Sequence, residues 1–315
     1  MRAPNFTVSI LIPVFNEKEN IDPLLERLLP IITTYSYEVI FINDGSRDGT
    51  DGKIKEHATT NSKIKLISFS RNFGHMNALS SGYAFAQGDC VISIDADCQD
   101  PPEIIPEMIE KWVNGTEIVY AKRQKREVDS FFKKTTAKFF YKLINFLSEV
   151  PIPQEVGDYR LLDRTVVDFL NELPEHSKFF RGLVAWSGYS TEYVYFNREK
   201  RYAGKTHYSF SKMLNFALDG VTSFSIKPLR MASYLGFVSA LIGFIGINYA
   251  LVGKFFRPSF FPQDWVSGWT LLFISIMFTG GVQLITIGII GEYISKIFIE
   301  VQRRPHYILK EKVNI

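Results

Sequence analysis

The stretch Val91-Ile92-Ser93-Ile94-Asp95-Ala96-Asp97-Cys98-Gln99-Asp100-Pro101-Pro102 decides the fold of this chain. Its first four residues predict a buried strand, and the paired prolines end the segment rigidly. Three side chains that carry oxygen follow the strand at every second position, namely Asp95, Asp97 and Gln99. Mg²⁺ and Mn²⁺ prefer such ligands and often share their shell with substrate phosphates. The stretch therefore predicts a divalent-metal site at the carboxyl end of a strand, with an acidic turn as the alternative.

Strands and helices alternate on the N-terminal side of this stretch. Apolar runs predict strands at 7–12, 38–42, 64–69 and 91–94, and helical spacing predicts helices at 20–32, 51–58 and 77–86. This alternation is typical of an α/β fold with a mostly parallel sheet between helices, in which ligands bind at the carboxyl ends of the strands. The residues at those ends are Pro13, Asp44, Arg71 and Asp95. We expect them to share one site, although residues 43–46 also form a good turn sequence.

Two long apolar stretches near the C-terminus contain no charged side chain. They cover residues 231–253 and 265–291. At about 1.5 Å of rise per residue, each is long enough to cross a hydrocarbon core about 30 Å thick. A pair of buried helices in a large soluble core is the alternative, but such helices seldom run this long without a charge. We therefore predict two transmembrane helices joined by a short external loop at 254–264.

Basic residues flank these stretches on their outer sides. They are Lys212, Lys227 and Arg230 before the first stretch, and Lys296, Arg303, Arg304, Lys310 and Lys312 after the second. The connecting loop holds only Lys254 and Arg257 against Asp264. Because short cytoplasmic segments carry the excess of Lys and Arg, both termini are predicted to be cytoplasmic.

The net charge and the cysteines exclude other classes. A formal net charge of +3 over 315 residues is too small to indicate a protein that binds nucleic acid. Cys90 and Cys98 form neither a zinc-type spacing nor a disulfide framework. At 130–148, lysines interleave with aromatic residues at helical spacing. This pattern predicts a basic amphipathic helix on an anionic bilayer, or else a surface helix packed on the sheet.

Several motifs together resemble family 2 glycosyltransferases with the GT-A fold. They are Ile12-Pro13-Val14-Phe15-Asn16-Glu17, Asn43-Asp44-Gly45-Ser46 and the stretch that begins at Asp95. The resemblance continues through residues 157–164, 180–186 and 201–206 and into the two apolar stretches, so it covers nearly the whole chain. It is strongest for the branch that transfers sugars to polyprenyl phosphates, which includes bactoprenol glucosyltransferases and dolichyl-phosphate mannosyltransferases.

The resemblance implies an activity and its location. It implies a Mg²⁺- or Mn²⁺-dependent, inverting transfer of a hexose to undecaprenyl or another polyprenyl phosphate, with UDP-glucose as the favoured donor. The catalytic domain would face the cytoplasm at a bacterial plasma membrane. A mannosyl or modified-sugar transferase is the alternative within the family, because these motifs do not identify the sugar. A catalytically dead membrane scaffold that binds sugar nucleotides is the alternative from another class. The intact Asp95, Asp97, Gln99 and Asp158 argue against it.

The resemblance also implies roles for individual positions. The nucleotide sugar would be held by Pro13, Phe15, Glu17, Ile42, Asp44, Asp95, Ala96, Asp97 and Arg123. The metal would be held by Asp95, Asp97 and Gln99, and the acceptor phosphate by Arg201, Lys205 and His207. Asp97 and Asp158 would be catalytic, Asp158 as the carboxylate often proposed as the base. A phosphate monoester has a second pKa of about 6 and is already largely anionic, so Asp158 alternatively orients the acceptor or holds a basic partner.

Two positions depart from related sequences. Gly204-Lys205-Thr206-His207 stands where relatives often carry Gly-Glu-Ser-Lys, so either Lys205 or His207 would supply the charge. Cys98 stands where leucine is common, which we expect to be harmless.

The sequence thus predicts a plan for the whole chain. Residues 1–204 form the GT-A domain, including the amphipathic helix, and 205–230 form an interfacial segment. The spans at 231–253 and 265–291 flank the external loop, and 292–315 form a cytoplasmic tail. Glycines in the spans allow helices to pack closely, which suits either a homo-oligomer or contact between the two spans.

Overall fold

The computed structural model describes residues 2, 5–124, 156–176, 178–197, 225–256 and 268–315. They belong to two compact units. The sheet unit comprises Met1–Asn145, Val150–Leu214 and Arg303–Ile315, and the helical unit comprises Phe146–Glu149 and Asn215–Gln302. The predicted amphipathic helix at 130–148 lies outside the described residues, as do 205–224 and 257–264 of the predicted interfacial segment and loop.

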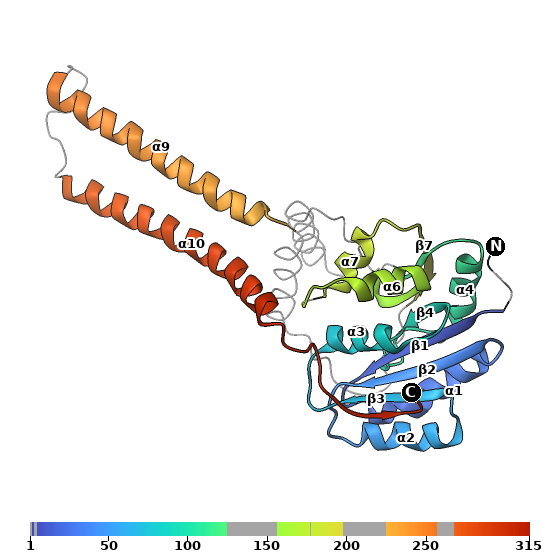
Figure 1. Ribbon diagram of the computed structural model, residues 1–315. Helices are drawn as coiled ribbons and strands as arrows, with labels where there is room; N and C mark the ends of the chain where they lie inside the picture. The colour runs from blue at the N-terminus through green and yellow to red at the C-terminus, as the bar shows by residue number, and fades with distance from the viewer. Residues whose placement is uncertain (1, 3–4, 125–155, 177, 198–224, 257–267) are drawn as a thin grey trace. The chain divides into compact units, whose positions relative to one another are not determined.

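The sheet unit is built on a mixed sheet of eight described strands in the order β7-β5-β6-β4-β1-β2-β3-β8 (Figure 1). The strands are β1 (Thr7–Val14), β2 (Ser36–Asn43), β3 (Ile64–Phe69), β4 (Cys90–Ser93), β5 (Ile118–Arg123), β6 (Val156–Asp163), β7 (Thr191–Phe196) and β8 (Leu309–Val313). The central strands β4, β1, β2 and β3 are parallel. β6 runs antiparallel to both of its neighbours, and β8 runs antiparallel to β3.

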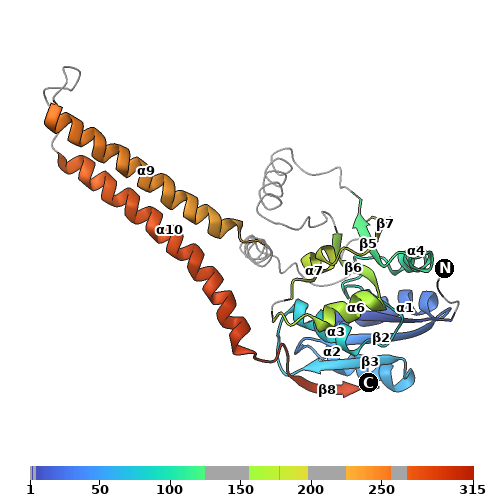
Figure 2. The ribbon, with the colours of Figure 1, turned by 45° about the horizontal axis from the view of Figure 1, so that its top comes forward.

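Helices cover both faces of the sheet, as Figures 1 and 2 show. α1 (Ile21–Ile32), α2 (Thr50–Thr60) and α4 (Ile105–Val113) pack on one face. α3 (His75–Phe85), α6 (Arg164–Glu172) and α7 (Phe180–Trp186) belong to the other. Short 3-10 turns, η1 (Lys18–Asn20) and η2 (Pro102–Ile104), precede α1 and α4. The predicted α/β fold is therefore confirmed.

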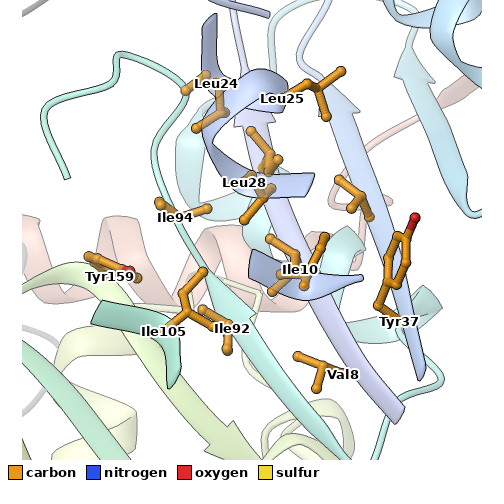
Figure 3. Close-up of a cluster of buried hydrophobic side chains, with 14 of the residues drawn as sticks. Val8, Ile10, Leu24, Leu25, Leu28, Tyr37, Ile92, Ile94, Ile105 and Tyr159 are labelled. Carbon is orange, nitrogen blue, oxygen red and sulfur yellow. The ribbon is translucent and has the colours of Figure 1, made fainter. Parts of the chain in front are cut away.

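The hydrophobic core explains why these residues form these elements. Val8 and Ile10 alternate along β1 onto one face and meet Leu24 and Leu28 of α1, which recur at helical spacing (Figure 3). All four side chains are fully buried. Burying an aliphatic side chain of this size contributes roughly 1.5–3 kcal/mol. The period of two on the strand and of about four on the helix therefore fixes which face each element buries.

The predicted strands and helices of the N-terminal part lie where the sequence placed them, to within a few residues. The C-terminal part differs from the plan. The last helix continues to Gln302, and Leu309–Val313 forms the edge strand β8 rather than only a tail. Tyr307 stacks on Phe69 of β3, with ring centroids 4.8 Å apart. The strand was not predicted because it is five residues long and three of them are charged, which is common for an exposed edge strand.

Asn314 fastens this C-terminal strand to the rest of the sheet unit. Its side-chain amide donates to the carbonyl oxygens of Ala58 and Ile64, both at 2.9 Å, and its backbone has φ of 60°. We expect Asn314→Ala to lower the melting temperature of the sheet unit by several degrees, because a lost hydrogen bond costs about 0.5–1.5 kcal/mol and alanine tolerates this φ poorly. Asn314→Gly separates the two effects, since glycine relieves only the backbone term. Equal melting temperatures for all three proteins would contradict this role.

The helical unit contains two long apolar helices, α9 (Lys227–Phe256) and α10 (Gly268–Gln302). Lys227–Gly246 and Leu272–Gln302 are long and apolar enough to cross a membrane, with mean hydropathies of 1.5 and 2.0, and their side chains are almost entirely exposed. The Tyr293 hydroxyl donates to the Ser225 carbonyl at 2.6 Å within this unit. Among the described atoms, none lies within 4 Å of a Cβ placed at Gly236, Gly243 or Gly280.

Candidate active site

The loops that follow β1 and β2 are tied together at the carboxyl edge of the sheet. The Asn16 N–H donates to Ser46 Oγ at 2.9 Å, and the Arg47 N–H donates to Asn16 Oδ1 at 2.9 Å. The Glu17 N–H donates to Thr50 Oγ1 at 3.1 Å, and the Glu17 carboxylate accepts from the Asn20 amide. These contacts hold the two loops together. The side chain of Phe15, in the first of them, is 43% exposed.

Asp44 joins β2 to the loop that follows β3. Its carboxylate is buried, and it accepts the Phe73 N–H on Oδ1 at 2.6 Å and the Gly74 N–H on Oδ2 at 2.9 Å. Burial raises the pKa of Asp44, and these two hydrogen bonds oppose the rise. Asp44 therefore determines where residues 71–74 lie, and with them the start of α3 at His75.

Gly45 lets the same two loops approach each other. Its φ is +71°, and a Cβ at this position would lie 2.4 Å from the carbonyl carbon of Arg71 and 2.7 Å from the nitrogen of Asn72. Both neighbours are backbone atoms that cannot rotate away. Glycine is therefore the residue that both the conformation and the contact require.

Gly45→Ala is expected to separate these loops. We expect it to destabilise the sheet unit by about 2 kcal/mol and to weaken nucleotide binding severalfold, because the chain must move Arg71. Gly49→Ala is the matched control: Gly49 has φ of +88°, but its Cβ would meet only the flexible side chain of Lys18 at 3.7 Å. Thermal melting and nucleotide titration would contradict the argument if the two variants behaved alike.

The Asp95–Pro101 segment leaves the end of β4 beside these loops. Ala96 and Asp97 are buried, and the Gln99 N–H donates to Asp97 Oδ1 at 3.1 Å. The Tyr159 hydroxyl holds the segment through the Pro101 carbonyl at 2.9 Å. Burial is the main cause that raises the pKa of Asp95; the charge of His75 opposes it, and those of Asp158 and Asp97 reinforce it. A cation bound by Asp95 and Asp97 would relieve the repulsion between these two carboxylates.

The donor set fits a metal that depends on its substrate for ligands. Within the described residues, no three His, Cys, Asp or Glu side chains form a group that would hold a metal ion. Mg²⁺ in particular is commonly bound by only one or two carboxylates together with substrate phosphates and waters. Asp95, Asp97 and Gln99 suit that arrangement, and the ion would then be bound together with a diphosphate.

Asp158 is the centre of a second charged cluster. It lies on β6, which pairs with β4 so that Arg160 is opposite Ser93; continuing this register brings Asp158 level with Asp95. Its carboxylate meets Arg160 Nη2 at 2.5 Å, Arg181 Nη2 at 2.8 Å and His75 Nε2 at 3.4 Å. Burial acts to raise the pKa of Asp158, but the charges of Arg181 and Arg160 and the hydrogen bond from His75 hold it well below its usual range.

The structure brings most of the predicted donor-site residues to one edge of the sheet. Ile42 does not present its side chain there: it is fully buried, and a Cβ at Gly82 of α3 would lie 3.1 Å from its Cδ1. Arg123 lies at the end of β5, 3.6 Å from Asp100, and its guanidinium passes over Gly157, where a Cβ would be 3.2 Å from Nη2. Arg201, Lys205 and His207 lie outside the described residues.

Sequence reasoning did not single out three residues of the Asp158 cluster. Arg160 and Arg181 belong to motifs that were recognised, but no spacing within the sequence links Arg181 to Asp158. His75 directly follows the loop of residues 71–74, which Asp44 holds through the Gly74 N–H. The alternation of β6 was the available signal for Arg160, because residues two apart on a strand share a face.

Comparison with known proteins gives one family and a consistent set of relatives. Residues 9–170 match the model of glycosyl transferase family 2. The chain is 43% identical over 308 residues to a prophage-derived bactoprenol glucosyl transferase of Shigella flexneri, covering 96% of this chain and 97% of that protein. It is 41% identical over 305 residues to a prophage bactoprenol glucosyl transferase homolog of Escherichia coli, with 96% and 98% covered.

Solved structures show the same fold at low identity. Glucosyl-3-phosphoglycerate synthase of Mycobacterium tuberculosis, in complex with Mg²⁺ and UDP, matches 69% of this chain and 77% of its own with a TM-score of 0.52 and 15% identity. The same enzyme with Mn²⁺, UDP and phosphoglyceric acid matches with a TM-score of 0.50 and 14% identity. These matches support the fold of the sheet unit.

Proposed function

Because the chain belongs to glycosyl transferase family 2, we propose that it transfers glucose from UDP-glucose to undecaprenyl or another polyprenyl phosphate. It is a glycosyltransferase similar to bactoprenol glucosyl transferases over almost its whole length. The observation that carries the proposal is the meeting of two charged groups at one sheet edge. The acidic Asp95–Asp97 pair suits a metal-bound diphosphate, and the cation-rich Asp158 cluster beside it suits a phosphate acceptor.

The donor is held by the ends of β1, β2 and β4. The exposed ring of Phe15 can stack on the base, and Glu17 and Asp44 can interact with the nucleoside from the two neighbouring loops. Asp95, Asp97 and Gln99 would hold Mg²⁺ or Mn²⁺ with the diphosphate. When bound, the ion stabilises the negative charge that develops on the leaving nucleoside diphosphate.

The acceptor needs little help from a base. A phosphate monoester with a second pKa of about 6 is mostly a dianion at neutral pH. One of its oxygen lone pairs attacks the anomeric carbon, the bond from that carbon to the diphosphate oxygen breaks, and the electron pair leaves with the nucleoside diphosphate. A single displacement of this kind inverts the anomeric configuration.

The helical unit supplies a reason for the two apolar helices. A polyprenyl chain stays in the bilayer while its phosphate lies at the headgroup level, so the enzyme must work at the interface. We place α9 and α10 across the membrane, with both termini and the sheet unit in the cytoplasm of a bacterial cell. The exposed apolar side chains of both helices support this placement, and so does the basic flanking sequence.

The test is release of nucleoside diphosphate by the full-length protein in detergent micelles. A panel of nucleotide sugars is supplied with Mg²⁺ or Mn²⁺, with and without undecaprenyl phosphate. We expect turnover of UDP-glucose only when lipid and metal are both present. Turnover of a mannose or modified-sugar donor instead would replace the sugar in the proposal. Nucleotide binding without turnover of any donor would contradict the proposed activity and favour a scaffold.

A further inference from the structure

Three basic side chains surround the carboxylate of Asp158, and they differ in exposure. The Arg160 side chain is 0% exposed, whereas Arg181 is 27% and His75 is 40% exposed. Arg160 therefore neutralises Asp158 from the protein interior. Arg181 and His75 meet the same carboxylate oxygen, Oδ2, from the accessible side. Two arginines and a histidine thus contact one carboxylate, and the two of these basic side chains that remain accessible lie on its outer side.

The two accessible basic groups come from separate elements, and both contact Asp158. His75 is the first residue of α3, whose start is held by the hydrogen bonds from Phe73 and Gly74 to Asp44. Arg181 lies in the first turn of α7, and its Nε also donates to Asp158 Oδ1 at 3.2 Å. Asp158 therefore orients both groups, and the N-terminus of α3 adds a favourable field for an anion.

The proposed reaction has an electrostatic requirement that the metal meets only in part. A phosphate dianion must approach a sugar that is still attached to a diphosphate, and the two anions repel each other strongly at short range. The metal site at Asp95 and Asp97 serves the diphosphate. His75 belongs to the Asp158 cluster, with its Nε2 3.4 Å from Asp158 Oδ2, and it directly follows Gly74, whose N–H donates to Asp44 of the donor site. It therefore connects the donor side of the sheet edge with the Asp158 cluster.

We propose that His75 and Arg181 bind the phosphate of the lipid acceptor, and that Asp158 is a positioning residue that holds them rather than the base. This inference rests on the proposed function. The phosphate accepts hydrogen bonds from the imidazole Nε2 and the guanidinium while a third oxygen attacks the anomeric carbon. No proton has to move to Asp158, whose ion pairs with Arg160 and Arg181 make its carboxylate a weak proton acceptor.

The test uses the full-length protein in lipid–detergent micelles with UDP-glucose, Mn²⁺ and undecaprenyl phosphate. We expect His75→Gln and Arg181→Gln each to raise the KM for undecaprenyl phosphate by about tenfold to a hundredfold, as for the loss of a charge-assisted hydrogen bond. The Kd for UDP should change by no more than about twofold. His75→Lys, which restores a cation, should recover part of the acceptor affinity. Matched controls are His57→Gln in α2 and Arg27→Gln in α1, whose side chains pair with Asp22 and Glu103. Both helices pack on the face of the sheet opposite α3 and α7.

The outcomes separate this inference from the proposed function. If wild-type protein does not glucosylate undecaprenyl phosphate, the proposed function fails and the inference with it. If wild-type protein is active but both glutamine variants keep its acceptor KM, the inference alone fails. A parallel loss of UDP affinity would assign His75 and Arg181 to the donor and would also overturn it. Unchanged UDP affinity in the variants shows that they are folded, so a rise in acceptor KM then supports the assignment directly.

Discussion

Asp97→Asn is expected to lower kcat/KM by about a thousandfold, a loss typical of removing one group that stabilises transition-state charge. Asparagine has the size of aspartate, and its Oδ1 can still accept the Gln99 N–H that closes the turn. The substitution therefore removes the negative charge while the fold of the 95–101 segment is retained. If Asp97 holds the divalent ion, the loss follows from weaker binding of the ion and the diphosphate together.

The decisive measurement is nucleotide binding in the presence and absence of Mn²⁺. Wild-type protein should bind UDP more tightly with the ion, and Asp97→Asn should bind it equally weakly in both conditions. Asp168→Asn is the matched control, because Asp168 is an exposed carboxylate on α6 that pairs only loosely with Arg164, at 3.5 Å. Full activity in Asp97→Asn, or an unchanged effect of Mn²⁺ on its UDP affinity, would remove Asp97 from the metal site.

The sheet was predictable from the sequence because its central strands are buried on both faces. Such strands read as continuous apolar runs, and the predicted 7–12, 38–42 and 64–69 match β1, β2 and β3 closely. The antiparallel strands β6 and β8 were harder to predict. β6 pairs antiparallel between β4 and β5, and β8 joins the edge from the far end of the chain. Neither pairing is a local property, so no window of sequence contains it.

The candidate site, too, could be predicted from the sequence only in part. The donor edge was predictable because parallel strands end at one edge of a sheet, which brings Pro13, Asp44 and Asp95 together. The environment of Asp158 could not be predicted, because it depends on the register of β6 against β4 and on the positions of α3 and α7. The sequence allowed Asp158 to be either a base or a holder of basic partners. Its contacts with Arg160 and Arg181 favour the second.

A double-mutant cycle on Asp158 and Arg160 should reveal a large coupling in stability. Asp158→Leu leaves the guanidinium of Arg160 fully buried without its carboxylate, and breaking a buried pair in this way costs about 3–5 kcal/mol. We expect the melting temperature of the sheet unit to fall by roughly 6–20 °C. Arg160→Met should cost less, because Asp158 keeps its contacts with Arg181 and His75.

The double variant Asp158→Leu/Arg160→Met should be more stable than Asp158→Leu alone, because no charge is then left buried without its partner. Its transferase activity should remain low, since Arg181 and His75 lose the carboxylate that orients them. Thermal melting followed by tryptophan fluorescence, together with UDP binding, separates the two effects. If the losses of stability of the two single variants simply add in the double variant, Asp158 and Arg160 are not energetically coupled. Recovery of activity along with stability would show that Asp158 does not position the acceptor-side cations, because its carboxylate would then be dispensable to the reaction.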